Sequence, residues 1–249
     1  MGSKAKYKKY IIPILQKTID NNNVETYIEC FVGGANIIDD IKCKNRIGYD
    51  RSDTLIALLN LAATDFDKVL KDGSRELWDK GKAYVKDGKI PQDMSLAEIG
   101  AIEFLASFNR RGFPGGYAKN TEKRNYYKES YKNLEEQAPK LKGITFKAQN
   151  YWELDKNIKN TVIYLDPPYQ NTKSYGYASQ GKMDYIHFWN WVREISKNNF
   201  VFISEQTAPD DFEILWEKQV KRTTNKTNDF KATEKLFRMK GGYNGVIHN

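Results

Sequence analysis

The chain of 249 residues has few of the residue types that build disulfide frameworks, metal centres or membrane spans. Its two cysteines, Cys30 and Cys43, and two histidines are too few for a disulfide framework and lack the spacing of a zinc or Cys/His nucleophile site. No apolar run approaches the roughly 20 residues that cross a bilayer, and no signal-peptide segment follows the N-terminus. We therefore expect a metal-free protein of the reduced cytoplasm without membrane contact.

Positive charge is in excess, with 40 Lys and Arg against 32 Asp and Glu. The excess gathers in two segments: residues 110–147 hold ten basic and four acidic side chains, and residues 218–240 hold eight basic and two acidic ones. A basic balance of this kind favours a polyanionic partner. Hydrophobic residues make up 40% of the chain, which supplies a substantial core, and 249 residues are enough for one α/β domain with an insertion or for two small domains.

The stretch T-V-I-Y-L-D-P-P-Y, residues 161–169, joins a short apolar run to an abrupt polar end. It predicts a buried parallel strand, and open α/β sheets bind ligands at the carboxyl ends of such strands. We expect Asp166 to lie there with a free carboxylate, followed by a stiff Pro-Pro turn and the ring of Tyr169. Carboxylate and carbonyl oxygens suit the protons of an exocyclic NH2 group, and the ring suits the face of its base. The alternative is an ordinary turn after a strand.

A second ligand-binding pattern occurs near the N-terminus. A predicted strand at 26–32 is followed by Gly33 and Gly34, and a second strand at 46–50 ends in Asp50. Glycines let a ligand approach the backbone, and an acid at the end of the second strand can accept two ribose hydroxyls. Because the glycines do not form G-x-G-x-x-G, the pattern favours an adenosyl ligand without phosphates over a pyrophosphate cofactor. An ordinary βαβ turn is the alternative.

Residues 65–142 are polar and mostly helical in pattern, with amphipathic helices predicted at 96–108 and 122–141. The loop between these helices mixes arginines, aromatic residues and glycines, which is typical of nucleic-acid contact, although a long solvated loop is the alternative. The candidate DNA-binding residues are Arg110, Arg111, Tyr117, Lys119, Lys123 and Arg124.

The C-terminal part returns to alternating strands and helices. A strand restarts at 144–151, a polar loop at 170–182 is a candidate lid, and a basic exposed strand is expected at 214–224. The helix predicted at 184–196 has Asp184 as its N-cap and five apolar residues directed mostly inward. These are Ile186, Phe188, Trp189, Val192 and Ile195.

The order of these motifs resembles the Dam-type (D12 class) DNA adenine-N6 methyltransferases, and the short phage-borne members in particular. The resemblance is carried by Gly2-Ser3-Lys4, by residues 29–36, by Asp50, by G-G-Y-A at 115–118 and by Asp166-Pro167-Pro168-Tyr169. It implies an α/β fold with a Rossmann-like seven-stranded sheet and a mainly helical target-recognition insertion. In that arrangement residues 1–64 and 143–249 form the catalytic domain, and residues 65–142 form the DNA-binding insertion.

The same resemblance implies S-adenosylmethionine as cofactor, S-adenosylhomocysteine as product and double-stranded DNA as partner, without a metal or an obligatory protein partner. The catalytic motif is then Asp166, Pro167, Pro168 and Tyr169. The implied cofactor-binding residues are Lys4, Glu29, Phe31, Gly33, Gly34, Ala35, Asp50, Asn150 and Asp166. Two positions depart from the family pattern: Cys30 stands where proline is common, and Asn150 where aspartate is usual.

Other functions remain open at this stage. Cytosine N4 and adenine in RNA also present an exocyclic amine, so D-P-P-Y does not distinguish these acceptors from adenine in DNA. A nucleic-acid-binding relative without turnover is a further alternative. The sequence names neither the recognition site nor the residues that read bases.

Overall fold

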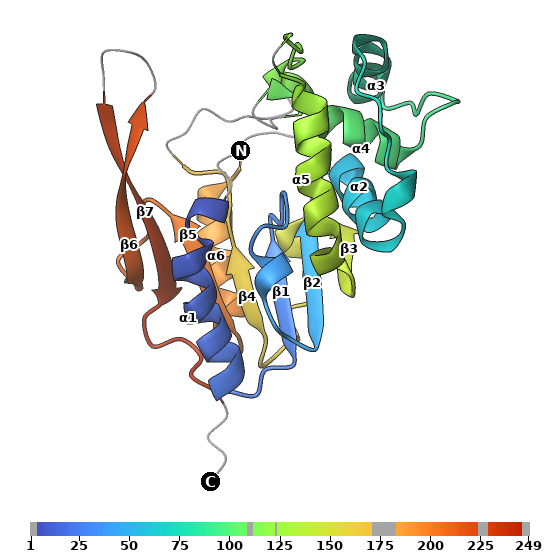
Figure 1. Ribbon diagram of the computed structural model, residues 1–249. Helices are drawn as coiled ribbons and strands as arrows, with labels where there is room; N and C mark the ends of the chain where they lie inside the picture. Colours follow the sequence, from blue (N-terminus) through green and yellow to red (C-terminus); the bar gives the residue numbers. More distant parts are fainter. Residues whose placement is uncertain (1–3, 109–111, 123, 171–182, 224–228, 246–249) are drawn as a thin grey trace.

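The computed structural model describes residues 4–108, 112–122, 124–170, 183–223 and 229–245. Its centre is a seven-stranded sheet with helices on both faces (Figure 1). The strands are β1 (Thr26–Cys30), β2 (Asn45–Asp50), β3 (Ile144–Ala148), β4 (Val162–Leu165), β5 (Phe200–Glu205), β6 (Phe212–Thr223) and β7 (Asp229–Met239). The described helices are α1 (Lys8–Asn21), α2 (Asp53–Thr64), α3 (Arg75–Asp87), α4 (Leu96–Leu105), α5 (Tyr126–Leu141) and α6 (Tyr185–Ile195).

The strands lie in the order β3-β2-β1-β4-β5-β7-β6. The first five pair in parallel, whereas β7 runs antiparallel to both β5 and β6. The strand order reverses between β1 and β4, which is the position where open α/β sheets bind their ligands. The predicted α/β class with a Rossmann-like seven-stranded sheet is confirmed.

Alternation along the central strands divides the core between the two faces of the sheet. Tyr164 of β4 and Phe202 of β5 join the cluster that holds buried residues of α1, α2 and α5. Ile163 and Ile203, one residue away on the same strands, join the cluster built on α6. Because β1, β4 and β5 are covered on both faces, their near-continuous hydrophobic sequence is explained.

Local capping sets where the helices begin. The side chains of Ser52, Ser74, Asn125 and Asp184 each accept a hydrogen bond from a backbone N–H of the first turn, and Ser95 forms a capping box with Glu98. These caps satisfy N–H groups that have no partner inside the helix. The predicted N-cap Asp184 is among them and is confirmed.

The helices of residues 65–142 pack directly onto the helix that follows β2. Gly100 of α4 lies against α2 so closely that a Cβ would come within 2.1 Å of the Thr54 carbonyl oxygen. Buried residues of this segment, such as Trp78, Ile99 and Tyr127, belong to the same hydrophobic cluster as Leu55 of α2. Residues 65–142 therefore share a hydrophobic core with the sheet.

Three local expectations were wrong. The helix predicted at 96–108 ends at Leu105 and is buried almost throughout rather than amphipathic, because both α2 and α3 pack against it. Ile186 does not face inward but is 79% exposed. The strand β7 was not predicted, because its many charged residues obscure the alternation of apolar and polar positions.

Two further statements concern the described residues alone. No helix among them is both long and apolar enough to cross a membrane. They contain no group of three or more His, Cys, Asp or Glu side chains arranged to hold a metal ion.

Candidate active site

The sequence motifs meet because they follow adjacent parallel strands. Cys30, the last residue of β1, pairs with Tyr49 of β2 on one side and with Leu165 of β4 on the other. The segments that come next are the glycine loop, which we define as residues 31–35, together with Asp50 and the D-P-P-Y turn, residues 166–169. Residues up to 138 positions apart, Phe31 and Tyr169, are thereby brought to one edge of the sheet.

The glycine loop has an unusual backbone. Phe31, Gly33 and Ala35 all have positive φ angles, of 63°, 51° and 55°. For the two non-glycine residues this left-handed conformation costs roughly 1–2 kcal/mol each. The loop is closed by hydrogen bonds from Val32 N to Tyr49 O (2.9 Å) and from Ala35 N to Val32 O (2.8 Å). Such a turn exposes backbone groups to an approaching ligand.

Asp50 links β2 to this loop. Its Oδ2 accepts a hydrogen bond from the Gly33 N–H at 3.1 Å, and its Oδ1 accepts one from the Ser52 N–H at 3.1 Å. Burial raises the pKa of Asp50, and the backbone N–H groups of Ser52 and Gly33 oppose that rise. Each carboxylate oxygen has a second lone pair, so the acid can still accept hydroxyl groups.

Asp166 lies at the end of β4 as predicted, but its carboxylate is not free. Lys4, only 8% exposed, donates from Nζ to Asp166 Oδ1 at 2.7 Å and lies 3.7 Å from Glu234 Oε2. The Tyr169 hydroxyl contacts both Lys4 Nζ and Glu234. The expectation of a free carboxylate was wrong because the N-terminal segment places a cation beside it. Burial raises the pKa of Asp166, and Lys4 opposes this.

Two further buried acids line the same edge of the sheet. Glu29 is 3% exposed and accepts the Tyr27 hydroxyl at 3.1 Å, and burial raises its pKa well above the usual value. Glu205 accepts the backbone N–H groups of Gln206 (2.6 Å) and Gln170 (3.2 Å). Burial raises the pKa of Glu205 to about 7. Glu205 thus anchors the residue that follows the D-P-P-Y turn.

Aromatic rings stand beside the glycine loop. The Tyr151 ring lies 5.4 Å from that of Phe31 and 5.3 Å from that of Phe188. Tyr151 is positioned by a short turn that begins at Asn150, whose N–H donates to Glu153 at 2.7 Å. The Tyr151 hydroxyl contacts His187 Nδ1 at 3.2 Å. The rings form a cluster at the loop, with an interplanar angle of 33° between Phe31 and Tyr151 and of 82° between Tyr151 and Phe188.

The candidate DNA-binding residues have different surroundings. Tyr117 is half-buried and donates to the Gly73 carbonyl at 2.8 Å, so its hydroxyl serves the insertion itself. Arg124 is exposed and pairs with Glu129 at 2.8 Å. Lys119 is exposed. The remaining predicted residues, Arg110, Arg111 and Lys123, and the lid segment 171–182 lie outside the described part of the chain.

Neighbours of this edge that the sequence did not predict include Glu205, Glu234 and Gln137, whose amide donates to the Gly34 carbonyl at 3.0 Å. The sequence gives one weak indication of Glu234, since it is one of only two acids in the basic segment 218–240.

A cavity of about 210 Å³ lies at the opposite end of the sheet, near the start of β5, and is lined by residues such as Lys17, Asn199 and Tyr243. None of the predicted site residues lines it.

Comparison with known proteins places the chain in a family. Modification methylase StsI of Streptococcus sanguinis is 25% identical over 221 residues, which are 81% of this chain and 32% of that protein. The chain thus spans about a third of the length of this relative. Two structures of the rRNA methyltransferase aviRa from Streptomyces viridochromogenes align with TM-scores of 0.45 and 0.42 at 10% and 8% identity. They cover 95% and 94% of this chain, and 85% and 84% of theirs. The family model of the D12 class N6 adenine-specific DNA methyltransferases matches residues 1–228, and the chain belongs to that family.

Proposed function

We propose that this chain transfers a methyl group from S-adenosylmethionine to the N6 amine of adenine in double-stranded DNA. The observation that carries the proposal is the pairing of β1 with β4, which sets the glycine loop beside the D-P-P-Y turn. A cofactor held by the loop would present its reactive end to Asp166. The family membership of the chain supports the same reaction.

The residues of the loop suit an adenosyl ligand. The backbone of Gly33 to Ala35 is turned by positive φ angles, and Asp50 has spare lone pairs for ribose hydroxyls. Phe31 and Tyr151 supply an apolar wall for the adenine ring of the cofactor. We assign Lys4, Glu29, Phe31, Gly33, Gly34, Ala35, Asp50, Asn150 and Asp166 to cofactor binding. When bound, the cofactor supplies a methyl group made electrophilic by a sulfonium.

Asp166 and the Pro167 carbonyl would act on the substrate amine. The lone pair of an exocyclic amine is delocalised into the ring, and acceptors for its two protons localise that pair on nitrogen. Lys4 occupies Asp166 Oδ1, so we assign Oδ2 to the amine. The Pro168 carbonyl already accepts the Tyr185 hydroxyl, which leaves the Pro167 carbonyl as the second acceptor.

In the transfer, the lone pair of the substrate nitrogen would form the N–C bond as the C–S bond breaks, with a neutral thioether as the leaving group. One N6 proton passes to Asp166 and from there to water. The raised pKa of Asp166 favours acceptance of this proton. Alignment of the reacting atoms supplies much of the rate, because the methyl group is already activated.

The adenine must leave the duplex to reach this edge of the sheet. We assign stacking of the extruded base to the Tyr169 ring, whose hydroxyl is anchored on Glu234. Residues 65–142 are assigned to DNA binding, with Arg110, Arg111, Tyr117, Lys119, Lys123 and Arg124 as candidate contacts. Action on cellular DNA places the chain in the cytoplasm of a bacterial or phage-infected cell.

A transfer assay tests the proposal. Purified protein is incubated with methyl-labelled S-adenosylmethionine and unmethylated duplex DNA, and the product is digested to nucleosides. We expect label in N6-methyladenine, and mapping the labelled positions gives the recognition site. Label in cytosine, or in RNA but not DNA, would retain the fold and change the acceptor. Cofactor binding without label in any nucleic acid would indicate a nucleic-acid-binding relative without turnover.

A further inference from the structure

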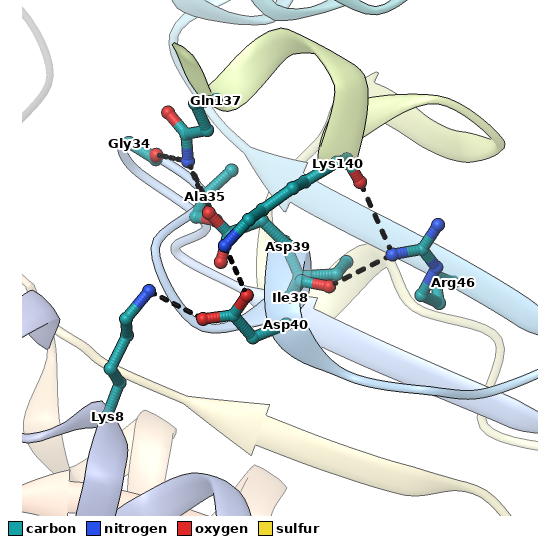
Figure 2. Close-up of polar contacts among 9 residues, drawn as sticks. All are labelled: Lys8, Gly34, Ala35, Ile38, Asp39, Asp40, Arg46, Gln137 and Lys140. Carbon is teal, nitrogen blue, oxygen red and sulfur yellow. Dashed lines mark hydrogen bonds and ion pairs between the residues drawn. The ribbon is translucent and has the colours of Figure 1, made fainter. Parts of the chain in front are cut away.

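The glycine loop is held from outside by a side chain of the insertion. Gln137 of α5 donates from Nε2 to the Gly34 carbonyl at 3.0 Å, to the Ala35 carbonyl at 3.2 Å and to Asp39 Oδ2 at 2.9 Å. Figure 2 shows the amide nitrogen directed at these acceptors. The amide has two N–H groups for three acceptors, so the donors are shared. Residues roughly 100 positions apart are joined by these contacts.

The loop needs such a support because its backbone is strained. Ala35 adopts φ +55° although it has a Cβ, and it is fully buried. Strained conformations persist where the surroundings over-determine them. The loop's own hydrogen bond from Ala35 N to Val32 O fixes its inner side. Gln137 fixes the outward carbonyls of Gly34 and Ala35.

A second set of contacts keeps Gln137 in place. One turn after Gln137, Lys140 Nζ donates to Asp40 Oδ1 at 2.7 Å, and Lys8 of α1 donates to Asp40 Oδ2 at 2.5 Å. Arg46 of β2 donates to the Lys142 carbonyl at 2.9 Å. The end of α5 is thus tied to the 3-10 turn that follows the loop, η2 (Ile38–Asp40), to α1 and to the sheet. Figure 2 shows this turn between Lys8 and Lys140.

We propose that Gln137 is a positioning residue for cofactor binding, which holds the glycine loop in its binding conformation by donating to the Gly34 and Ala35 carbonyls. This inference rests on the proposed function, because it takes the loop as the cofactor loop. It also makes the insertion part of the cofactor site. Gln137 acts through the loop and touches no reacting atom.

The test uses three variants that separate donor character from size. Gln137→Met has a similar shape without donors, Gln137→Lys keeps donors, and Gln137→Glu sets a carboxylate against Asp39 and two carbonyls. Glu135→Met, exposed on the same helix, is the matched control. The measurements on the full chain are the dissociation constant of S-adenosylhomocysteine by calorimetry, the melting temperature, and kcat at saturating cofactor.

We expect Gln137→Met to weaken S-adenosylhomocysteine binding by about tenfold, the size expected for one or two lost hydrogen bonds. Gln137→Lys should bind better than Gln137→Met, and Gln137→Glu worse. At saturating cofactor, kcat should stay within about twofold of wild type. The substitution weakens cofactor binding equally in the ground state and the transition state, and it removes no interaction that is made only in the transition state. Glu135→Met should match wild type throughout.

The outcomes are distinguishable from those of the proposed function. Wild-type affinity in Gln137→Met, or a loss that follows melting temperature instead of donor character, would overturn the inference and leave the proposed function intact. Binding that follows the donor series without methyl transfer to any nucleic acid would support the inference and overturn the function. A wild-type chain that does not bind S-adenosylhomocysteine would overturn both. If Gln137→Met fails to fold, the dissociation constants of Gln137→Lys and Gln137→Glu are compared instead, and Gln137→Lys should bind more tightly than Gln137→Glu.

Discussion

The glycine loop and the D-P-P-Y turn lie side by side at the ends of β1 and β4, yet they are fixed by different interactions. The loop is held through its own backbone groups: the Gly33 N–H donates to the Asp50 carboxylate, and the Gly34 and Ala35 carbonyls accept from the Gln137 amide. Buried charges hold the turn, where Lys4 lies between Asp166 and Glu234. The backbone conformation of the loop is thus fixed by hydrogen bonds, whereas the turn is fixed by the ion pairs that Lys4 makes.

This difference matches what each segment is proposed to do. A segment that binds a cofactor gains affinity when its backbone is already ordered, because no conformational entropy is then lost on binding. A segment that accepts a proton needs an acid whose ionisation is poised by nearby charges. Mutations should therefore affect binding at the loop, and chemistry and stability at the turn.

The largest expected effect is on chemistry at the turn. Asp166→Ala should lower methyl transfer by about a thousandfold, since it removes a proton acceptor aimed at the amine. Binding of duplex DNA should change little. Asp166→Asn keeps one acceptor oxygen and should retain part of the activity. Single-turnover transfer and binding measurements check this, and parallel losses of transfer and binding in Asp166→Ala would contradict the role.

The next-largest expected effect is on the free energy of unfolding. Removal of a buried cation is compared with removal of a more exposed one. Lys4→Met should lower the free energy of unfolding by about 3 kcal/mol, because it removes the cation beside the partly buried Asp166 carboxylate. Lys8→Met removes a cation that is 33% exposed and pairs with Asp40, and it should cost less than about 1 kcal/mol. Urea denaturation measures both. Equal losses would contradict the view that charge holds the turn.

Glu103 can be compared with Asp166, because it is a buried acid that has no cation beside it among the described residues. Glu103 of α4 is fully buried and accepts the Thr54 hydroxyl at 2.7 Å, while its Oε1 has no hydrogen-bond partner among the described residues. Burial raises its pKa from 4.5 to about 7, and the Thr54 hydroxyl opposes this only in part. Lys4 opposes the rise in the pKa of Asp166, whereas at Glu103 the opposing group is the Thr54 hydroxyl and not a cation.

The pH dependence of stability follows from that raised pKa. Between pH 4.5 and 7 the folded state binds more protons at Glu103 than the unfolded state does. The contribution of Glu103 is therefore fully present below its unfolded pKa and is lost as pH rises through about 7. Glu103→Gln should flatten this slope and raise the free energy of unfolding at pH 8 by roughly 2–3 kcal/mol. Denaturation at several pH values tests it, with the exposed Glu76→Gln as control, and an unchanged slope would refute it.

The smallest expected effect is in the glycine loop. Ala35→Gly relieves the left-handed strain, but it also increases the entropy of the unfolded chain, so stability should change by less than about 1 kcal/mol. The dissociation constant of S-adenosylhomocysteine should stay close to that of wild type, because the bonds that fix the loop come from its backbone and from Gln137. A large loss of affinity would show that the Ala35 side chain itself shapes the loop.

Much of the site could be predicted from the sequence because its motifs follow strands. The apolar run before Asp166 and the glycines after β1 each indicate the carboxyl end of a buried strand, and parallel pairing brings such ends together. The family resemblance placed Lys4 and Asp166 in one cofactor site, but their direct ion pair could not be predicted, because the two residues are 162 positions apart and no local pattern joins them. The exposed Ile186 was missed for a related reason, since periodicity does not show where an apolar face ends.

By itself the sequence determined the local elements, the motifs and the family they resemble, since hydrophobic period, capping residues and glycine position act over a few neighbours. The tertiary structure decided which charges meet. Glu234 reaches Lys4 from a strand whose charged sequence concealed it, and Gln137 reaches the glycine loop from a helix expected to serve DNA. Long-range contacts of this kind depend on how layers pack, and the free energy of that packing is distributed over the whole core.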